Sequence, residues 1–286
     1  GVALAQSGGA AEALDGFARA LAIEPGNAQA LMGRALVLQE THRVRDAIAA
    51  YDAVLQRQPG NHAARSARLL TLHYAEGVTR DQFFAEHREF GRQVERSPAS
   101  EIPFTNQPEP GRKLRVAFLS PDLRAHSVAY FLQPLLAHLE RQSFEIILYH
   151  DHVRVDSVSE QLRRQAVLWR NFAGQPAEVV ETSIRGDAPD LLVDLAGHTG
   201  FNRLLLFARR LAPVQVTYLG YPDTTGVPAM DYRLVDGVTD PEGGADAYAT
   251  ERLIRFAPTA WAYDPPKNAP EPGRLTTNGG VTFGCF

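Results

Sequence analysis

The stretch that decides the fold is VAFLSPDLRAHSVAYF, residues 116–131. It begins as an apolar, partly β-branched run, passes through the polar turn SPDLRAHS at residues 120–127, and becomes apolar again. This order is typical of a buried strand that leads through a turn into a helix. In α/β proteins, ligand sites form at such turns after the carboxyl end of a strand. We therefore interpret residues 120–127 as one wall of a crevice.

From Lys113 onward, short apolar runs alternate with helical segments. The expected strands are LRVAFLS, FEIILYH, VLWRNF, DLLVDLAG, VQVTYLG, YRLVD and RLIRF, and the expected helices span residues 128–142, 157–165, 177–186 and 202–211. Apolar runs without polar alternation indicate strands that are buried on both faces, which with intervening helices predicts a parallel sheet. The usual order is 3-2-1-4-5, so that strands 1 and 4 are neighbours. Pro134 is expected to kink the first helix or delay its start.

Three polar loops should meet at one edge of this sheet: SPDLRAHS after strand 1, DLAGHTG after strand 4 and LGYPDTTG after strand 5. His126 suits general acid–base work because an imidazole titrates near neutral pH. The alternative is an ordinary histidine at the start of a helix, beside Ser127 as N-cap. Asp194 either orients an imidazole, such as that of His198, or caps the next helix. Residues 219–226 either line a ligand or form only a tight turn.

The sequence lacks the motifs that are typical of several other enzyme classes. The turn after strand 1 has no glycines for a dinucleotide, and no phosphate-binding loop, GxSxG elbow or DxD pair occurs. Ser120, His126 and Asp194 therefore make an unconvincing triad. His150 and His152 are too few for a metal site, and we interpret them as a solvated strand end.

The composition also limits the class of protein. The only cysteine is Cys285, which excludes a disulfide framework and argues against a cysteine-based zinc site. A net charge of -4 with 22% charged residues favours neither nucleic acid nor a membrane surface as partner. No apolar stretch reaches the roughly 18 residues of a membrane helix, and no signal-peptide pattern opens the chain. We expect a cytoplasmic protein.

The first seventy residues repeat. AIEPGNAQAL and LQRQPGNHAA are near copies, and Pro25 and Pro59 are 34 residues apart, which is the tetratricopeptide period. The matching positions are Ala13/Ala47, Phe17/Tyr51, Ala20/Val54 and Pro25/Pro59. Small residues let two helices approach, aromatic residues fill the space between them, and each proline stops a helix. Residues 1–72 therefore resemble tetratricopeptide repeats. The first unit is expected to begin before Gly1, and a third, altered unit starts near His62 and leads into a Pro-rich linker.

From Lys113 the sequence resembles glycosyltransferase family 41, the O-linked N-acetylglucosamine transferases. The resemblance rests on RVAFLSPDLRAHSVAYF, ILYH, DLLVDLAGHTG, RRLAPVQVTYLGYPDTTGVPAMDYRLVDGVTDP and GGVTFGCF. It implies an α/β Rossmann-like lobe, the first lobe of a GT-B glycosyltransferase, preceded by an all-α tetratricopeptide-repeat superhelix. GGVTFGCF resembles the first strand of the second lobe, so both ends are expected to be truncated.

The implied organisation has four parts. Residues 1–74 are the repeats, 75–112 a helical connector and Pro-rich linker, 113–258 the N-terminal catalytic lobe, and 259–286 a linker with the first strand of the C-terminal lobe.

The resemblance also implies an activity: inverting, metal-independent transfer of N-acetylglucosamine from UDP-GlcNAc to Ser or Thr hydroxyls of proteins, without a cofactor. The repeats would present the acceptor. His126 matches the proposed base, or a group close to the reacting hydroxyl, and Asp194 and His198 match a loop that faces the sugar and acceptor. The implied substrate-binding residues are Thr199, Tyr221, Pro222, Thr224 and Thr225. The alternatives are a non-catalytic repeat scaffold, or a family member that uses another UDP-sugar or acceptor.

Overall fold

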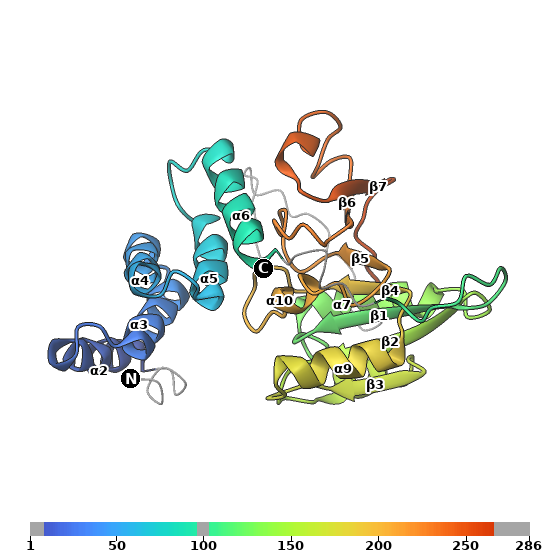
Figure 1. Cartoon of the computed structure of the whole chain (residues 1–286), viewed down its shortest axis with the longest axis horizontal. Coiled ribbons are helices and arrows are strands. Elements are labelled where there is room, and N and C mark those ends of the chain that lie inside the picture. The colour runs from blue at the N-terminus through green and yellow to red at the C-terminus, as the bar shows by residue number, and fades with distance from the viewer. Residues whose placement is uncertain (1–8, 96–102, 266–286) are drawn as a thin grey trace, which may run out of the picture.

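The computed structural model describes residues 9–95 and 103–265, and it shows a helical region beside an α/β lobe (Figure 1). The helices of the first region are α2 (Ala10–Ile23), α3 (Ala28–Glu40), α4 (Val44–Arg57), α5 (His62–Leu72) and α6 (Arg80–Val94). Within the described part, no helix is long and apolar enough to cross a membrane. The predicted first strand of a second lobe, residues 279–286, lies outside the described residues.

The two Pro-Gly-Asn copies separate successive helix pairs, as the repeat predicts. Asn27 and Asn61 are the N-caps of α3 and α5, and their side chains accept hydrogen bonds from the Ala30 and Ala64 amides at 2.9 and 3.0 Å. Tyr51 is fully buried. The repeated residues therefore serve as stops, caps and fillers of the same helical unit.

The lobe is built on a sheet of seven parallel strands. They are β1 (Leu114–Ser120), β2 (Phe144–His150), β3 (Leu168–Asn171), β4 (Leu191–Asp194), β5 (Val214–Thr217), β6 (Tyr232–Asp236) and β7 (Arg252–Phe256). Their order is β3-β2-β1-β4-β5-β6-β7, which confirms the predicted order of the first five strands. The winding reverses between β1 and β4, where the carboxyl edge of a doubly wound sheet opens a crevice.

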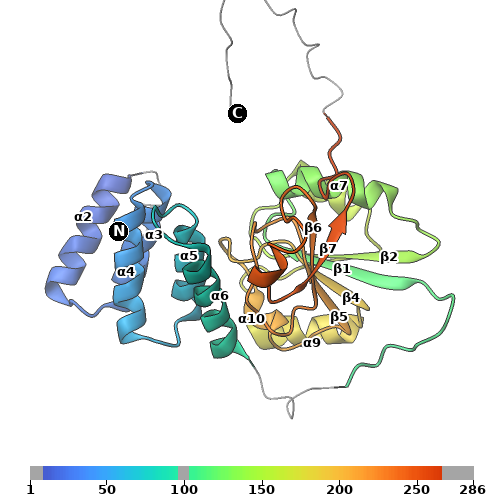
Figure 2. The same cartoon turned by 90° about the horizontal axis from the view of Figure 1, so that it is seen from above.

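Helices cover both faces of the sheet (Figure 2). One face packs against α7 (Ser127–His138) and α8 (Ser157–Arg163), and the other against α9 (Ala177–Asp187) and α10 (Leu204–Phe207), while a 3-10 turn, η2 (Asp246–Tyr248), precedes β7. Residues of α5 and α6, including Leu69 and Phe90, belong to the same buried cluster as Ala117 and Leu119 of β1. The last helix pair and the lobe thus share one hydrophobic core.

Two helices differ from expectation. α7 begins at Ser127 with Pro134 inside it, so the proline does not delay its start. The predicted helix over residues 202–211 is only one turn long, because the side chain of Gln215 donates to the Phe207 carbonyl at 2.8 Å and accepts from the Leu211 amide at 3.0 Å. These bonds occupy the Leu211 amide and the Phe207 carbonyl, which would otherwise bond to each other in a longer α10. Arg210 also has a φ angle of 51°, outside the range of a right-handed helix.

Candidate functional site

The loops after β1, β4 and β5 begin at neighbouring points of the carboxyl edge. β4 lies between β1 and β5, and Asp194 at its end is paired in register with Leu119 and Thr217. The three loops predicted to meet therefore start side by side. Their side chains, however, have very different surroundings.

His126 is the N-cap of α7, which corrects the expectation that Ser127 would cap this helix. Its Nδ1 accepts a hydrogen bond from the Val128 amide at 3.3 Å, and its Nε2 lies 3.7 Å from the carboxylate of Asp122. Asp122 is buried and also pairs with Arg124 at 3.2 Å. The imidazole is 36% exposed. Because Nδ1 accepts, the neutral ring carries its proton on Nε2, on the side of Asp122.

Asp194 is buried, with 1% of its surface exposed. Its carboxylate accepts from the amides of Ala196 and Gly197 at 3.1 and 2.8 Å and from the hydroxyl of Thr217 at 2.9 Å. Burial raises its pKa to about 6. Asp194 thus neither orients an imidazole nor caps a helix. It holds the turn after β4 onto β5.

The side chain of His198 is buried, and only 1% of its surface is exposed. Its Nδ1 lies 2.8 Å from the hydroxyl of Ser66 on α5, and its Nε2 lies 2.9 Å from the carbonyl oxygen of Thr225. Burial lowers the pKa of His198 well below its usual value, so the ring is neutral. A carbonyl only accepts, so Nε2 donates and Nδ1 accepts from Ser66. In this arrangement no lone pair of His198 is left to take a proton from a substrate.

The hydroxyls of the other candidate threonines also point into the protein. Thr199 donates to the carbonyl of Ala196 at 2.8 Å. Thr224 and Thr225 are fully buried and donate to the carboxylate of Glu251, at 2.6 Å for Thr224, and the Thr225 amide donates there at 2.7 Å. These threonines hold the loop in place, and none of them is a free donor for a ligand.

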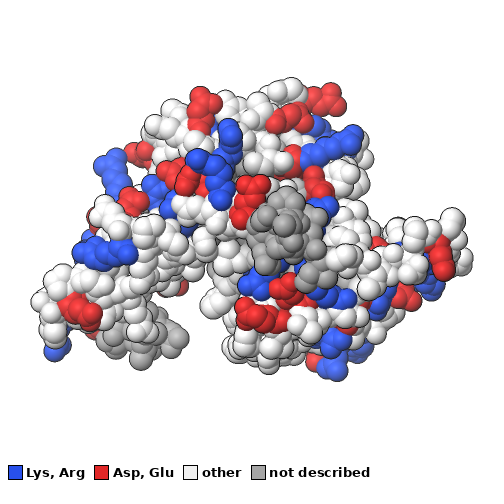
Figure 3. Space-filling view, in the orientation of Figure 1, with Lys and Arg blue, Asp and Glu red and all other residues white. Residues whose placement is uncertain are grey.

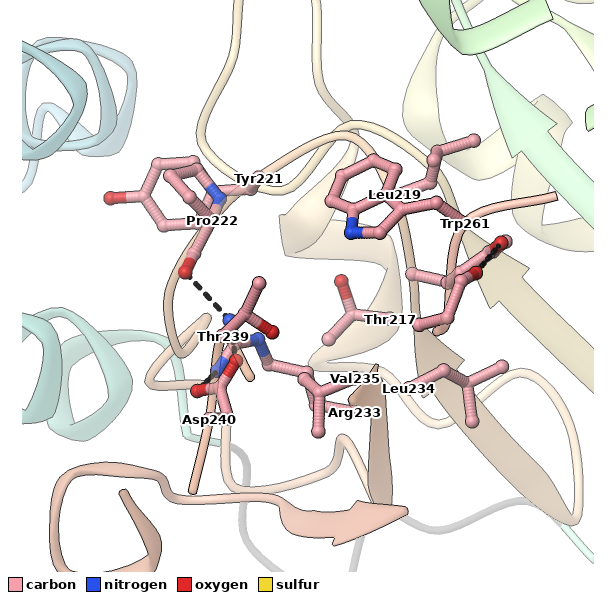
Figure 4. Close-up of a pocket in the computed structure, with 12 residues that line it drawn as sticks. Thr217, Leu219, Tyr221, Pro222, Arg233, Leu234, Val235, Thr239, Asp240 and Trp261 are labelled. Atoms are coloured by element: carbon pink, nitrogen blue, oxygen red, sulfur yellow. Dashed lines mark hydrogen bonds and ion pairs between the residues drawn. The ribbon is translucent and has the colours of Figure 1, made fainter. Parts of the chain in front are cut away.

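Tyr221 and Pro222 line a cavity of about 100 Å³ at the ends of β5 and β6 (Figure 4). Arg233 in its wall donates to the Pro222 carbonyl at 2.6 Å and to Asp240 at 2.9 Å. Trp261 closes another side, where its ring contacts Phe131 of α7 at 5.3 Å between centroids. The tyrosine hydroxyl turns away from this space and lies 2.8 Å from Nε2 of His87 on α6.

Of the candidate residues in the three loops, His198 and Thr225 contact each other through a hydrogen bond. His126 has its partners, Asp122 and Val128, within its own part of the chain.

The interpretation of His150 as part of a solvated strand end is wrong: it is fully buried, stacks on Trp169, and places Nε2 2.9 Å from the Arg154 carbonyl. Among the described residues, no group of three or more His, Cys, Asp or Glu side chains is arranged to hold a metal ion.

Sequence reasoning missed the residues that hold these loops from outside. They are Ser66, His87, Arg233, Glu251 and Trp261. Ser66 lies in the repeat region and His87 in the helical connector, and in both helices a buried polar residue carries no local motif. Glu251 directly precedes β7, and an acidic residue just outside a strand carries no signal of a buried role.

Comparisons with known proteins agree with this architecture. A family model described as glycosyl transferase family 41 matches residues 93–264. The chain is 35% identical over 238 residues to a tomato protein (Solanum lycopersicum) named probable UDP-N-acetylglucosamine–peptide N-acetylglucosaminyltransferase SPINDLY, covering 81% of this chain and 26% of the relative. A Caenorhabditis elegans UDP-N-acetylglucosamine–peptide N-acetylglucosaminyltransferase is 30% identical over 156 residues, covering 54% of this chain and 14% of that protein.

A solved structure has the same fold. It is a mutant of the Thermobaculum terrenum O-GlcNAc transferase, with a TM-score of 0.84 and 32% identity, and the match covers 92% of this chain and 50% of that one. The chain thus spans about half the length of the bacterial enzyme and about a quarter of the tomato relative.

Proposed function

Since the chain belongs to glycosyl transferase family 41, we propose that it forms the repeat region and first lobe of an enzyme that transfers N-acetylglucosamine from UDP-GlcNAc to Ser or Thr hydroxyls of proteins. The observation that carries this proposal is the joint match of helices and lobe to a solved O-GlcNAc transferase over 92% of the chain. The named relatives support the donor and the peptide acceptor. The cytoplasmic location stays a prediction.

Among the three candidate catalytic residues, His126 is the one whose side chain can touch a substrate in the proposed reaction. It is 36% exposed at the carboxyl edge, whereas Asp194 and His198 are each 1% exposed. With Nδ1 accepting from Val128, the neutral imidazole offers Nε2–H as a donor. Its role is therefore to orient the acceptor hydroxyl or stabilise developing charge. Taking the proton itself requires Nδ1 to release the Val128 amide.

Asp194 and His198 act in this proposal as supports of the two neighbouring loops. Tyr221 and Pro222 supply a wall of the substrate cavity, and Thr199, Thr224 and Thr225 keep the loops in shape. The transfer is inverting and needs no metal, so EDTA should leave the rate unchanged. A displacement of this kind depends on oriented approach and on stabilisation of the leaving diphosphate.

A protein acceptor would reach the site along the hollow between the helices and the lobe. This hollow of about 530 Å³ is open to solvent. Its lining includes Met32 and Leu36 of α3, His62 of α5, and Phe201 and Leu205 of the lobe. Its lining is mostly apolar with a few polar groups, which suits an extended peptide. On the visible face, acidic and basic side chains are intermingled, as Figure 3 shows, rather than gathered into the single-sign patch that nucleic acid requires.

The test uses the protein at its natural length, incubated with a candidate acceptor and UDP-GlcNAc, UDP-glucose or UDP-galactose. Intact-mass analysis should show addition of one N-acetylhexosamine with UDP-GlcNAc. His126→Ala should lower kcat at least 100-fold, and His138→Ala, at the exposed end of the same helix, should not. Transfer of another sugar would point to the alternative donor. Absence of transfer with every donor would favour a binding scaffold, and full activity of His126→Ala would remove this residue from the mechanism.

A further inference from the structure

A directional chain of hydrogen bonds runs from the helical region into the lobe. We propose that Ser66 of α5 is a positioning residue for the transfer, because it anchors the loop at residues 221–226 through His198. We call this series of hydrogen bonds the Ser66–Glu251 relay; its members are Asn202, Ser66, His198, Thr225 and Glu251. The inference rests on the proposed function for its catalytic consequence, but the relay itself has an independent readout.

Each bond of the relay has one possible direction. The amide of Asn202 donates to Ser66 Oγ at 3.1 Å, which leaves the serine hydroxyl hydrogen for His198 Nδ1 at 2.8 Å. His198 Nε2–H then donates to the Thr225 carbonyl at 2.9 Å, and the Thr225 amide donates to Glu251 at 2.7 Å. Every donor therefore has an acceptor only in this arrangement, which fixes the orientation of each member.

Four of the five members of the relay are buried, while Asn202 is partly exposed at the hollow between the helices and the lobe. Ser66 is 4% exposed, His198 1%, Thr225 0% and Glu251 5%. A buried polar group that loses its partner cannot replace it with solvent, so removal of one member leaves the next one unsatisfied. Among the members of the relay, Ser66 is the one that lies in the helical region, on α5, whereas the others belong to the lobe.

A second tie joins the same loop to the neighbouring helix. His87 of α6 places Nδ1 2.9 Å from the Phe83 carbonyl, so Nε2 accepts from the Tyr221 hydroxyl at 2.8 Å. The backbones also touch, since a Cβ on Gly91 would lie 1.9 Å from the carbonyl oxygen of Gly226. The loop is thus held by helices on the side that faces away from the cavity.

The opposite side of this loop lines the cavity at the ends of β5 and β6. Pro222 contributes to its wall and accepts from Arg233 at 2.6 Å, three residues before Thr225 (Figure 4). A change in the Thr225 backbone is therefore transmitted to the cavity wall over one short turn. In this way the helices set the shape of a surface that they do not line themselves.

The test compares Ser66→Ala with Thr71→Val in the protein at its natural length. Thr71 lies on the same helix, is 1% exposed, and donates to the Ala67 carbonyl of its own helix at 2.8 Å, so Thr71→Val removes a buried hydroxyl outside the relay. Hydrogen–deuterium exchange of residues 225–227 is the first readout, because these amides are bonded to Glu251, Thr224 and Thr225. We expect Ser66→Ala to speed their exchange about tenfold, the factor that one net hydrogen bond is worth, and Thr71→Val to leave it unchanged.

Turnover is the second readout. Ser66→Ala should lower kcat/KM about tenfold, Thr71→Val should not, and Ser66→Thr, which keeps the hydroxyl, should restore both readouts. Equal exchange in Ser66→Ala and Thr71→Val overturns the relay. Faster exchange with unchanged turnover overturns the positioning role. A wild-type protein that exchanges slowly at this loop but transfers no sugar refutes the proposed function instead.

Discussion

Acid should weaken the junction between α5–α6 and the lobe, because this junction buries neutral histidines. His87 is fully buried, and His73 and His198 lie beside it, each packed against Tyr221. Burial lowers the pKa of His87 and that of His73 to about 4 and the pKa of His198 well below its usual value. In the unfolded chain these groups titrate near their ordinary values. Unfolding therefore takes up protons below about pH 6.5.

The sign and size of this loss of stability follow from the linkage between proton binding and folding. A histidine whose pKa falls from 6.5 to about 4 on folding stabilises the fold fully above pH 6.5 and loses this contribution as the pH approaches 4. Between pH 7 and 5 the loss for His87 is about 2 kcal/mol, and the less buried His73 adds about 1 kcal/mol. Asp194 has the opposite sign: its pKa is raised to about 6, so its protonation recovers about 1 kcal/mol over the same interval. The net expected loss from these three groups is about 2 kcal/mol, and His198, whose pKa is lowered well below its usual value, adds to this loss.

Guanidinium unfolding at pH 7 and pH 5 measures this loss, with tryptophan fluorescence as the probe. His87→Gln removes the largest assigned contribution, so its free energy of unfolding should fall about 2 kcal/mol less than that of the wild type between the two pH values. His138→Gln, at an exposed histidine, should behave as the wild type does. The reasoning is refuted if His87→Gln and the wild type lose the same free energy of unfolding on acidification.

Two further substitutions test the packing of the loop at residues 221–226. Gly91→Ala should cost about 3 kcal/mol in thermal unfolding, because the new Cβ would lie 1.9 Å from a backbone oxygen of Gly226 that cannot move away freely. Gly186→Ala, where a Cβ meets open space in α9, should be neutral or stabilising by up to about 1 kcal/mol; similar melting temperatures for the two variants would contradict this contrast. Glu251→Gln should destabilise the protein by about 2 kcal/mol, since one of the two carboxylate oxygens that accept from Thr224 and Thr225 becomes a donor and the remaining bonds lose the charge that strengthens them. A Glu251→Gln protein as stable as the wild type in the same assay would show that this bond contributes little.

The local sequence carries the information for most of the helices and strands. The Pro-Gly-Asn copies predict where helices stop and start, because proline ends one helix and the asparagine side chain caps the next. Apolar runs predict the parallel strands, and the rule for winding predicts their order. By the same argument, Asp194, His198 and Thr225 fall in adjacent loops. All of these inferences depend on interactions between residues that are close in the chain or on general rules of topology.

Which side chains are exposed at the carboxyl edge of the sheet was decided by the tertiary structure alone. His126 and His198 both follow a buried strand in a polar loop, and nothing local distinguishes them. One is 36% exposed and the other 1%, because α5 covers the second loop and supplies Ser66, which lies 132 residues away in the sequence. The same holds for the shortened α10, which Gln215 of β5 ends. The local pattern of a sequence sets which backbone elements form, whereas the exposure and protonation of a side chain depend on which distant element packs over it.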